Sequence, residues 1–146
     1  MTLQVAAGPS SAPLPKPLTD QHIRDIGCVA TLGLLADDQR RGIAASRRFP
    51  DVTARGRKYA GIVGDRVVFE TGQPVAVIGL AIRRAVEERQ RLAVAASDQG
   101  KDPTDILGGL MADCLPLLNA VIPEQPPAVP GEQTGNVTAN PPEPAQ

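Results

Sequence analysis

The placement of its prolines constrains the fold of this 146-residue chain more than any other feature. Of fifteen prolines, four lie in the first seventeen residues and seven in the last twenty-four. Proline-rich ends with few large apolar residues cannot bury enough surface to offset the entropy of ordering them. The sequence therefore predicts disordered tails at 1–17 and 123–146, around a folded domain of residues 18–122.

The composition of that domain favours helices over a sheet. Aromatic residues make up 2% of the chain and tryptophan is absent, so the core must consist of Ala, Val, Ile and Leu. Such residues suit packed helices better than a twisted sheet, whose strands are enriched in aromatic residues. We therefore expect an all-α fold, a small four-helix bundle-like domain.

Helix start and stop signals place the first two helices. The first begins at Thr19, which can act as N-cap, with Leu18 placed to pack onto Ile23. The second follows Pro50, has Asp51 or Thr53 as its cap, and ends at Gly72. Its apolar residues are Val52, Tyr59, Ile62, Val63, Val67 and Phe69.

Proline marks the start of the other two helices. Pro74 suits the first position of a helix that runs to about Ala96, with apolar residues that include Val75, Ile78, Ile82 and Leu92. Its exposed side should carry the ion pairs Arg83–Glu87, Arg84–Glu88 and Glu87–Arg91.

The fourth helix begins with Asp102 as cap and Pro103 as its first residue. Its apolar face should comprise Ile106, Leu107, Leu110, Met111, Cys114, Leu117 and Leu118. Pro116 lies inside it, so we expect a kink or break near residues 112–115.

The only two cysteines, Cys28 and Cys114, lie near the middle of the first and fourth expected helices. In an up-down-up-down bundle these helices are neighbours, so the pair suits one inter-helix disulfide. The alternative is two separate buried thiols, which are common in cytosolic cores. We favour the disulfide and a structural role, because two cysteines and one histidine make a poor zinc site and no C-x-x-C motif occurs.

The single histidine, His22, falls in the first turn of the first helix. We expect a solvated side chain there rather than a catalytic base, because nothing nearby in the sequence would activate or orient it. The adjacent acidic pairs Asp37-Asp38 and Glu87-Glu88 are expected on the surface, because neighbouring helical residues point in different directions.

Basic residues are concentrated in one stretch, residues 40–58. It holds seven of the fifteen lysines and arginines, with one opposing acid, Asp51. Such a patch attracts phosphate-bearing polyanions or anionic surfaces. The alternative is a solvated connection whose arginines pair with Asp37, Asp38, Glu87 and Glu88. The seven residues are Arg40, Arg41, Arg47, Arg48, Arg55, Arg57 and Lys58.

Residues 49–88 also resemble the helix pair of ribbon-helix-helix DNA-binding proteins. The matching elements are Phe49-Pro50-Asp51, Glu70-Thr71-Gly72 and the run from Ile78 to Ala85. The resemblance implies a dimeric cytoplasmic regulator, in which the preceding GIAASRRF would form the ribbon that reads bases in a groove.

Enzyme motifs are missing from the sequence. No Gly-rich phosphate loop, H-E-x-x-H, G-x-S-x-G or EF-hand loop occurs, so we expect no enzyme, cofactor or metal. The sequence predicts a non-enzymatic helical binding or accessory protein whose Arg-rich connection contacts a protein or polyanionic partner. Nucleic acid is not favoured at a net charge of −1. The alternatives are the DNA-binding regulator and an enzyme without a recognisable motif.

The compartment depends on what precedes Met1. The segment MTLQVAAGPSSAP has no basic n-region and is not expected to be a signal peptide. No apolar run reaches the ~18 residues of a membrane span. A leader removed upstream would place the protein in the periplasm with oxidised cysteines, and a native Met1 in the cytoplasm with reduced ones.

Overall fold

The computed structural model describes residues 12–125, and within that range the chain is all-α. This confirms the predicted four-helix, bundle-like fold, and the described range contains no strand. The predicted tails lie mostly outside the described residues. The elements are α1 (Asp20–Arg40), the 3-10 helix η1 (Ala44–Arg48), α2 (Thr53–Thr71), α3 (Val75–Asp98) and α4 (Pro103–Val121).

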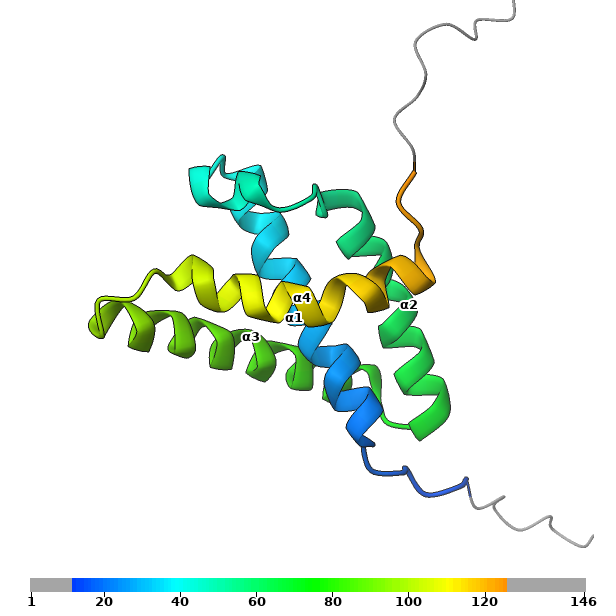
Figure 1. Ribbon diagram of the computed structural model, residues 1–146. Helices are drawn as coiled ribbons and strands as arrows, with labels where there is room; N and C mark the ends of the chain where they lie inside the picture. Colours follow the sequence, from blue (N-terminus) through cyan, green and yellow to red (C-terminus); the bar gives the residue numbers. More distant parts are fainter. Residues whose placement is uncertain (1–11, 126–146) are drawn as a thin grey trace, which may run out of the picture.

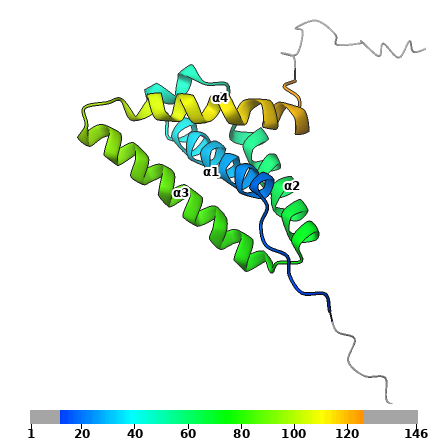
Figure 2. The same ribbon diagram turned by 60° about the horizontal axis from the view of Figure 1, so that its bottom comes forward.

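Helix α1 lies in the middle of the domain and packs against α2, α3 and α4. Figure 2 shows these three helices around α1, and in Figure 1 α4 crosses in front of it. Residues 25–32 of α1 form an unbroken buried run, because neighbours cover the helix on several sides. The domain is thus organised around its first helix.

The caps that begin α1 and α4 and end α2 are those expected from the sequence. Thr19 caps α1, and Asp102 caps α4 with Pro103 in its first turn. Gly72 ends α2 in the left-handed conformation, with φ 67°, which glycine adopts without steric cost. The end of α2 also contacts the segment before α1, because the Lys16 N–H donates to the Thr71 carbonyl at 2.7 Å.

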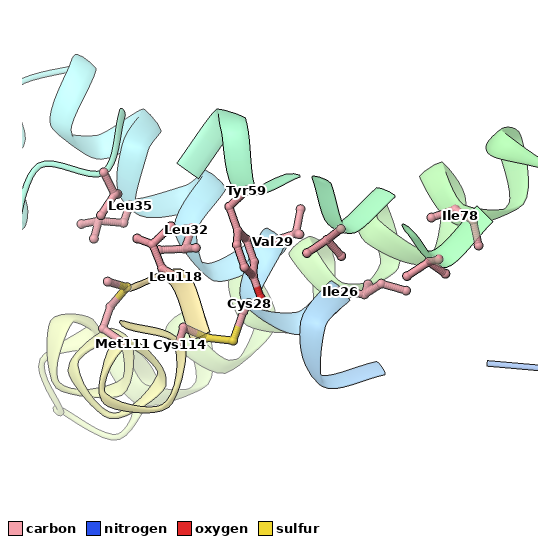
Figure 3. Packing of buried hydrophobic residues seen from close by; sticks show 13 residues of the cluster. Ile26, Cys28, Val29, Leu32, Leu35, Tyr59, Ile78, Met111, Cys114 and Leu118 are labelled. Atoms are coloured by element: carbon pink, nitrogen blue, oxygen red, sulfur yellow. A yellow bond between two sulfur atoms is a disulfide. The ribbon is translucent and has the colours of Figure 1, made fainter. Parts of the chain in front are cut away.

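The buried face of α2 is narrower than its apolar content suggests. Tyr59, Val63 and Val67 are each four residues apart, so they lie on one side of α2 and pack into the core, as Figure 3 shows for Tyr59. The other two apolar residues named for this helix, Ile62 and Phe69, are 42% and 89% exposed. These two residues are seven apart and lie together on a side of the helix that the core does not cover.

Helix α3 is the least buried of the four. Only Ile78 and Ala96 are fully buried, whereas Val75 and Leu92 are largely exposed. No carboxylate in the described residues lies within 4 Å of an α3 arginine, so the ion pairs predicted along α3 are not formed.

Helix α4 continues through Pro116, so of the predicted kink or break the break does not occur. The carbonyl that loses its helical partner belongs to Ala112, which is exposed and can bind water instead. By length and apolarity, α4 is the one described helix that could span a membrane. In this domain Met111, Cys114 and Leu118 of α4 are buried, and its other residues are partly or fully exposed.

The stretch GIAASRRF, the candidate ribbon of the DNA-binding alternative, contains η1. Ser46 is buried within it and donates a hydrogen bond to the Ile43 carbonyl at 2.6 Å. The segment is therefore a helical turn in this chain, and its conformation lends no support to that alternative.

Candidate anion-binding site

Cys28 and Cys114 form the disulfide that the sequence predicts. Their Cα atoms are 5.3 Å apart, and the bond joins the middle of α1 to α4. Both residues are buried beside Met111 and Leu118 in the core (Figure 3). The disulfide is a structural link, and it holds α4 across the central helix.

Three of the seven basic residues are paired with carboxylates. Arg40 and Arg41, at the end of α1, both contact Asp37, at 2.6 and 3.4 Å. Arg48 lies 3.6 Å from Asp105 and stacks on Phe49, with its guanidinium 5.4 Å from the ring centre. Arg40 and Arg41 thus fit the alternative of a connection paired with Asp37, whereas the partner of Arg48, Asp105, was not among the acids expected.

Arg55 extends from α2 to the end of α4. Its Nη2 donates to the Asn119 side chain and, at 2.6 Å, to the Ile122 carbonyl. A cation there compensates the negative end of the α4 dipole. Its Nε is buried and has no hydrogen-bond partner in the described part of the chain. A buried donor without a partner is unusual in folded proteins.

The other three residues, Arg47, Arg57 and Lys58, are exposed. None lies within 4 Å of a carboxylate of residues 12–125. Arg57 and Lys58 border a surface hollow of about 910 Å³ between the start of α2 and the end of α4. We call it the basic hollow; it is lined by Asp51, Ala54, Arg55, Arg57, Lys58 and residues 122–125.

The start of α2 adds to the positive potential of the basic hollow. Its first turn contains no acidic residue, so its backbone N–H groups present the positive end of the dipole. Asp51 accepts hydrogen bonds from the Thr53 hydroxyl and amide, at 2.7 and 2.9 Å, which lower the pKa of this carboxyl. Asp51 and Glu124 offset part of the charge of the three cations. The arrangement can bind an anion.

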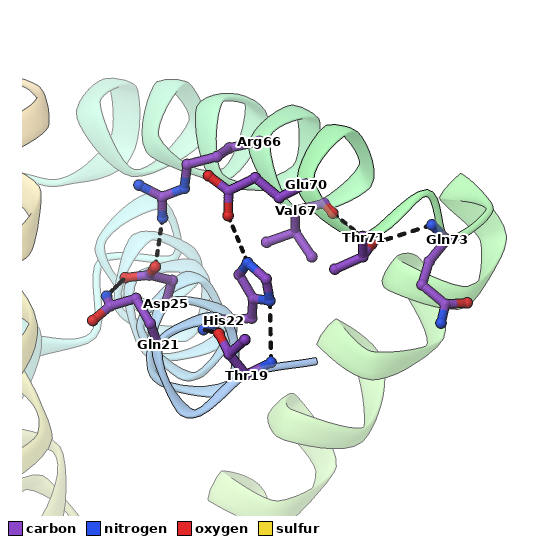
Figure 4. Close-up of polar contacts among 9 residues, drawn as sticks. All are labelled: Thr19, Gln21, His22, Asp25, Arg66, Val67, Glu70, Thr71 and Gln73. Atoms are coloured by element: carbon purple, nitrogen blue, oxygen red, sulfur yellow. Dashed lines mark hydrogen bonds and ion pairs between the residues drawn. The ribbon is translucent and has the colours of Figure 1, made fainter. Parts of the chain in front are cut away.

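His22 is buried, in contrast to the solvated side chain predicted from the sequence. It is 6% exposed, and Figure 4 shows both ring nitrogens engaged. The Thr19 amide donates to Nδ1 at 3.1 Å, so Nδ1 carries no proton and Nε2 donates to Glu70 at 2.7 Å. His22 completes a capping box with Thr19 and fastens α1 to α2.

A second polar cluster, which the sequence did not predict, lies between α1 and α2. Asp25 is buried in the α1–α2 interface, where it pairs with Arg66 and accepts from Gln21 at 3.0 Å (Figure 4). The Tyr59 hydroxyl lies 3.5 Å from the same carboxylate. Burial and the negative charge of Asp25 raise the pKa of Tyr59 to about 12. The i,i+4 pair Gln21 and Asp25 was the only signal of this cluster in the sequence.

Tyr59 makes stability sensitive to alkali. Because its pKa rises from 10.0 to about 12 on folding, the unfolded chain loses this proton first. We therefore expect the free energy of unfolding to fall as pH rises through that window. Tyr59 is the only tyrosine, so tyrosinate absorbance reports it alone. A midpoint near 10 in the folded protein would contradict this prediction, and Tyr59→Phe, which cannot ionise, is the control.

Residues 12–125 contain no group of three His, Cys, Asp or Glu side chains that could hold a metal ion. Comparison with known proteins finds no matching family model, no similar curated protein and no similar solved structure. The interpretation of the site therefore depends on its own geometry.

Proposed function

We propose that this protein is a non-enzymatic binding or accessory protein that holds an anionic partner at the basic hollow. The observation that carries the proposal is the gathering of three cations, Arg55, Arg57 and Lys58, around one surface hollow. Arg57 and Lys58 are exposed there, and neither has a carboxylate within 4 Å in the described chain.

The partner that fits this chemistry is a polyanion with phosphate or sulfate groups. The net charge of the chain is −1, so attraction must come from a local patch and not from the whole molecule. Arg47, on η1, extends the unpaired positive charge along the connection that precedes α2. Binding of this kind releases counterions, and it should weaken steeply as salt concentration rises.

Neutralising the unpaired cations is expected to weaken polyanion binding while the fold is kept. The variant Arg47→Ser/Arg57→Ser/Lys58→Ser should elute from a heparin column at lower salt than the wild type. Arg55 is retained because it holds the end of α4.

The matched control is Lys16→Ser/Arg83→Ser/Lys101→Ser, which removes three exposed cations elsewhere. It has the same net charge as the first variant, so the two should differ only if position matters. Equal retention of the two variants would show that the basic hollow is ordinary surface.

A further inference from the structure

We propose that a second, separate site lies between α1, α3 and α4, and that it binds a single-chain amphiphile with one anionic headgroup, such as a long-chain carboxylate. Arg89 would hold the headgroup, and the floor of the groove would hold the chain. This groove shares no lining residue with the basic hollow, so each proposal can be tested without the other.

The volume of the groove and its apolar floor are typical of a small-molecule site. Its volume is about 810 Å³, within the range of ~300–1,000 Å³ typical of ligand pockets. Its floor is apolar, and Ile23, which borders it, is 58% exposed although it is a large aliphatic residue. The floor includes Ile26, the Cys28–Cys114 disulfide, Ala81, Ala85 and Leu110.

Arg89 is held in the groove by contacts with both α1 and α3. Its Nε donates to the Thr31 hydroxyl at 2.9 Å, and Nη1 donates to the Ala85 carbonyl at 3.3 Å. Nη2 lies over Gly27, where an added Cβ would approach it to 2.6 Å. A glycine at position 27 is therefore what allows this guanidinium to lie against α1.

The charge of Arg89 has no counter-ion in the described residues. Its side chain is partly buried, and no carboxylate of residues 12–125 lies within 4 Å. A partly buried charge without a partner is costly, so an anionic group beside it is favourable. Two N–H groups of Nη2 and one of Nη1 are left to donate hydrogen bonds, and a carboxylate can accept them with its two oxygens.

The other charged residues of the groove lie at its rim. Arg24, Arg84, Arg91, Glu87, Glu88 and Asp113 are all exposed, so solvent screens them and their opposite signs largely cancel. Arg89 is thus the one charged side chain of this groove that is partly buried. One such cation above an apolar floor matches a ligand with one anionic head and one apolar tail.

The wild-type protein tests the ligand chemistry directly. In isothermal titrations, dodecanoate should bind at least about tenfold more tightly than dodecanol or dodecyltrimethylammonium, because a charge-assisted hydrogen bond to Arg89 is lost in both. Equal affinity for the three, or binding to vesicles of anionic phospholipid without binding to dodecanoate, would overturn the proposal.

Variants test the role of Arg89. Arg89→Met should lose the preference for dodecanoate over dodecanol, whereas Arg83→Met, on the same helix outside the groove, should keep it. Gly27→Ala should reduce dodecanoate affinity by displacing the guanidinium. Unchanged dodecanoate affinity in Arg89→Met would overturn the proposal, and if that variant does not fold, the wild-type comparison still decides.

Discussion

Reduction of the Cys28–Cys114 disulfide is expected to lower the free energy of unfolding by roughly 4–5 kcal/mol. The two cysteines are 86 residues apart, so the bond closes a long loop and lowers the entropy of the unfolded chain. The measurement is urea unfolding of the oxidised and reduced wild type, which have the same side chains and differ only in the crosslink.

The variant Cys28→Ala/Cys114→Ala separates the crosslink from the packing of the sulfur atoms. It should be less stable than the reduced wild type, because two buried sulfurs leave space in the core. A loss below about 1 kcal/mol on reduction would contradict the prediction, since it would mean that the crosslink restricts the unfolded chain very little.

Removal of the Arg66 side chain is expected to have the next largest effect. The Arg66→Met variant leaves the buried Asp25 carboxylate without its ion-pair partner. Losing one partner of a buried pair costs about 3–5 kcal/mol, and we expect about 2–4 kcal/mol here because the Arg66 side chain is 38% exposed. Urea unfolding at neutral pH measures the loss.

Adding the substitution Asp25→Asn tests whether the loss of stability in Arg66→Met comes from the unpaired carboxylate. In the Asp25→Asn/Arg66→Met variant no buried charge remains, so it should be more stable than Arg66→Met alone. The control is Arg83→Met, which removes an exposed guanidinium without an ion pair and should change stability little. If Arg66→Met is as stable as this control, the Asp25–Arg66 pair does not hold α1 against α2.

Local signals in the sequence were enough to predict the helices. Thr19, Gly72 and Asp102 each satisfy or permit backbone geometry at a helix end, and such effects act within a few residues. The disulfide was predictable for a related reason, because two cysteines on apolar faces of neighbouring helices have few other partners.

Long-range polar contacts were not predictable in this way. His22 and Glu70 are 48 residues apart, and Asp25 and Arg66 are 41 apart, so only the packing of α1 on α2 brings them together. The exposure of Ile62 and Phe69 has the same origin, since apolar character does not say which side of a helix meets a neighbour.

The candidate anion site was only partly predictable. The cluster of basic residues is a sequence property, but the sequence could not show which of them form ion pairs. Asp37 pairs with both Arg40 and Arg41 at the end of α1, and Asp105 approaches Arg48 from a distant part of the chain. The basic hollow itself requires the end of α4 to lie beside the start of α2, which Arg55 achieves through its contact with Ile122.

Backbone NMR of the isotope-labelled protein tests the central claim, anion binding at the basic hollow, most directly. We expect a heparin oligosaccharide to shift the amide signals of residues 51–58 and 119–125 most strongly, with changes that fade at high salt. Shifts of similar size spread over all exposed lysines and arginines, or none in residues 51–58, would contradict the assignment of this site.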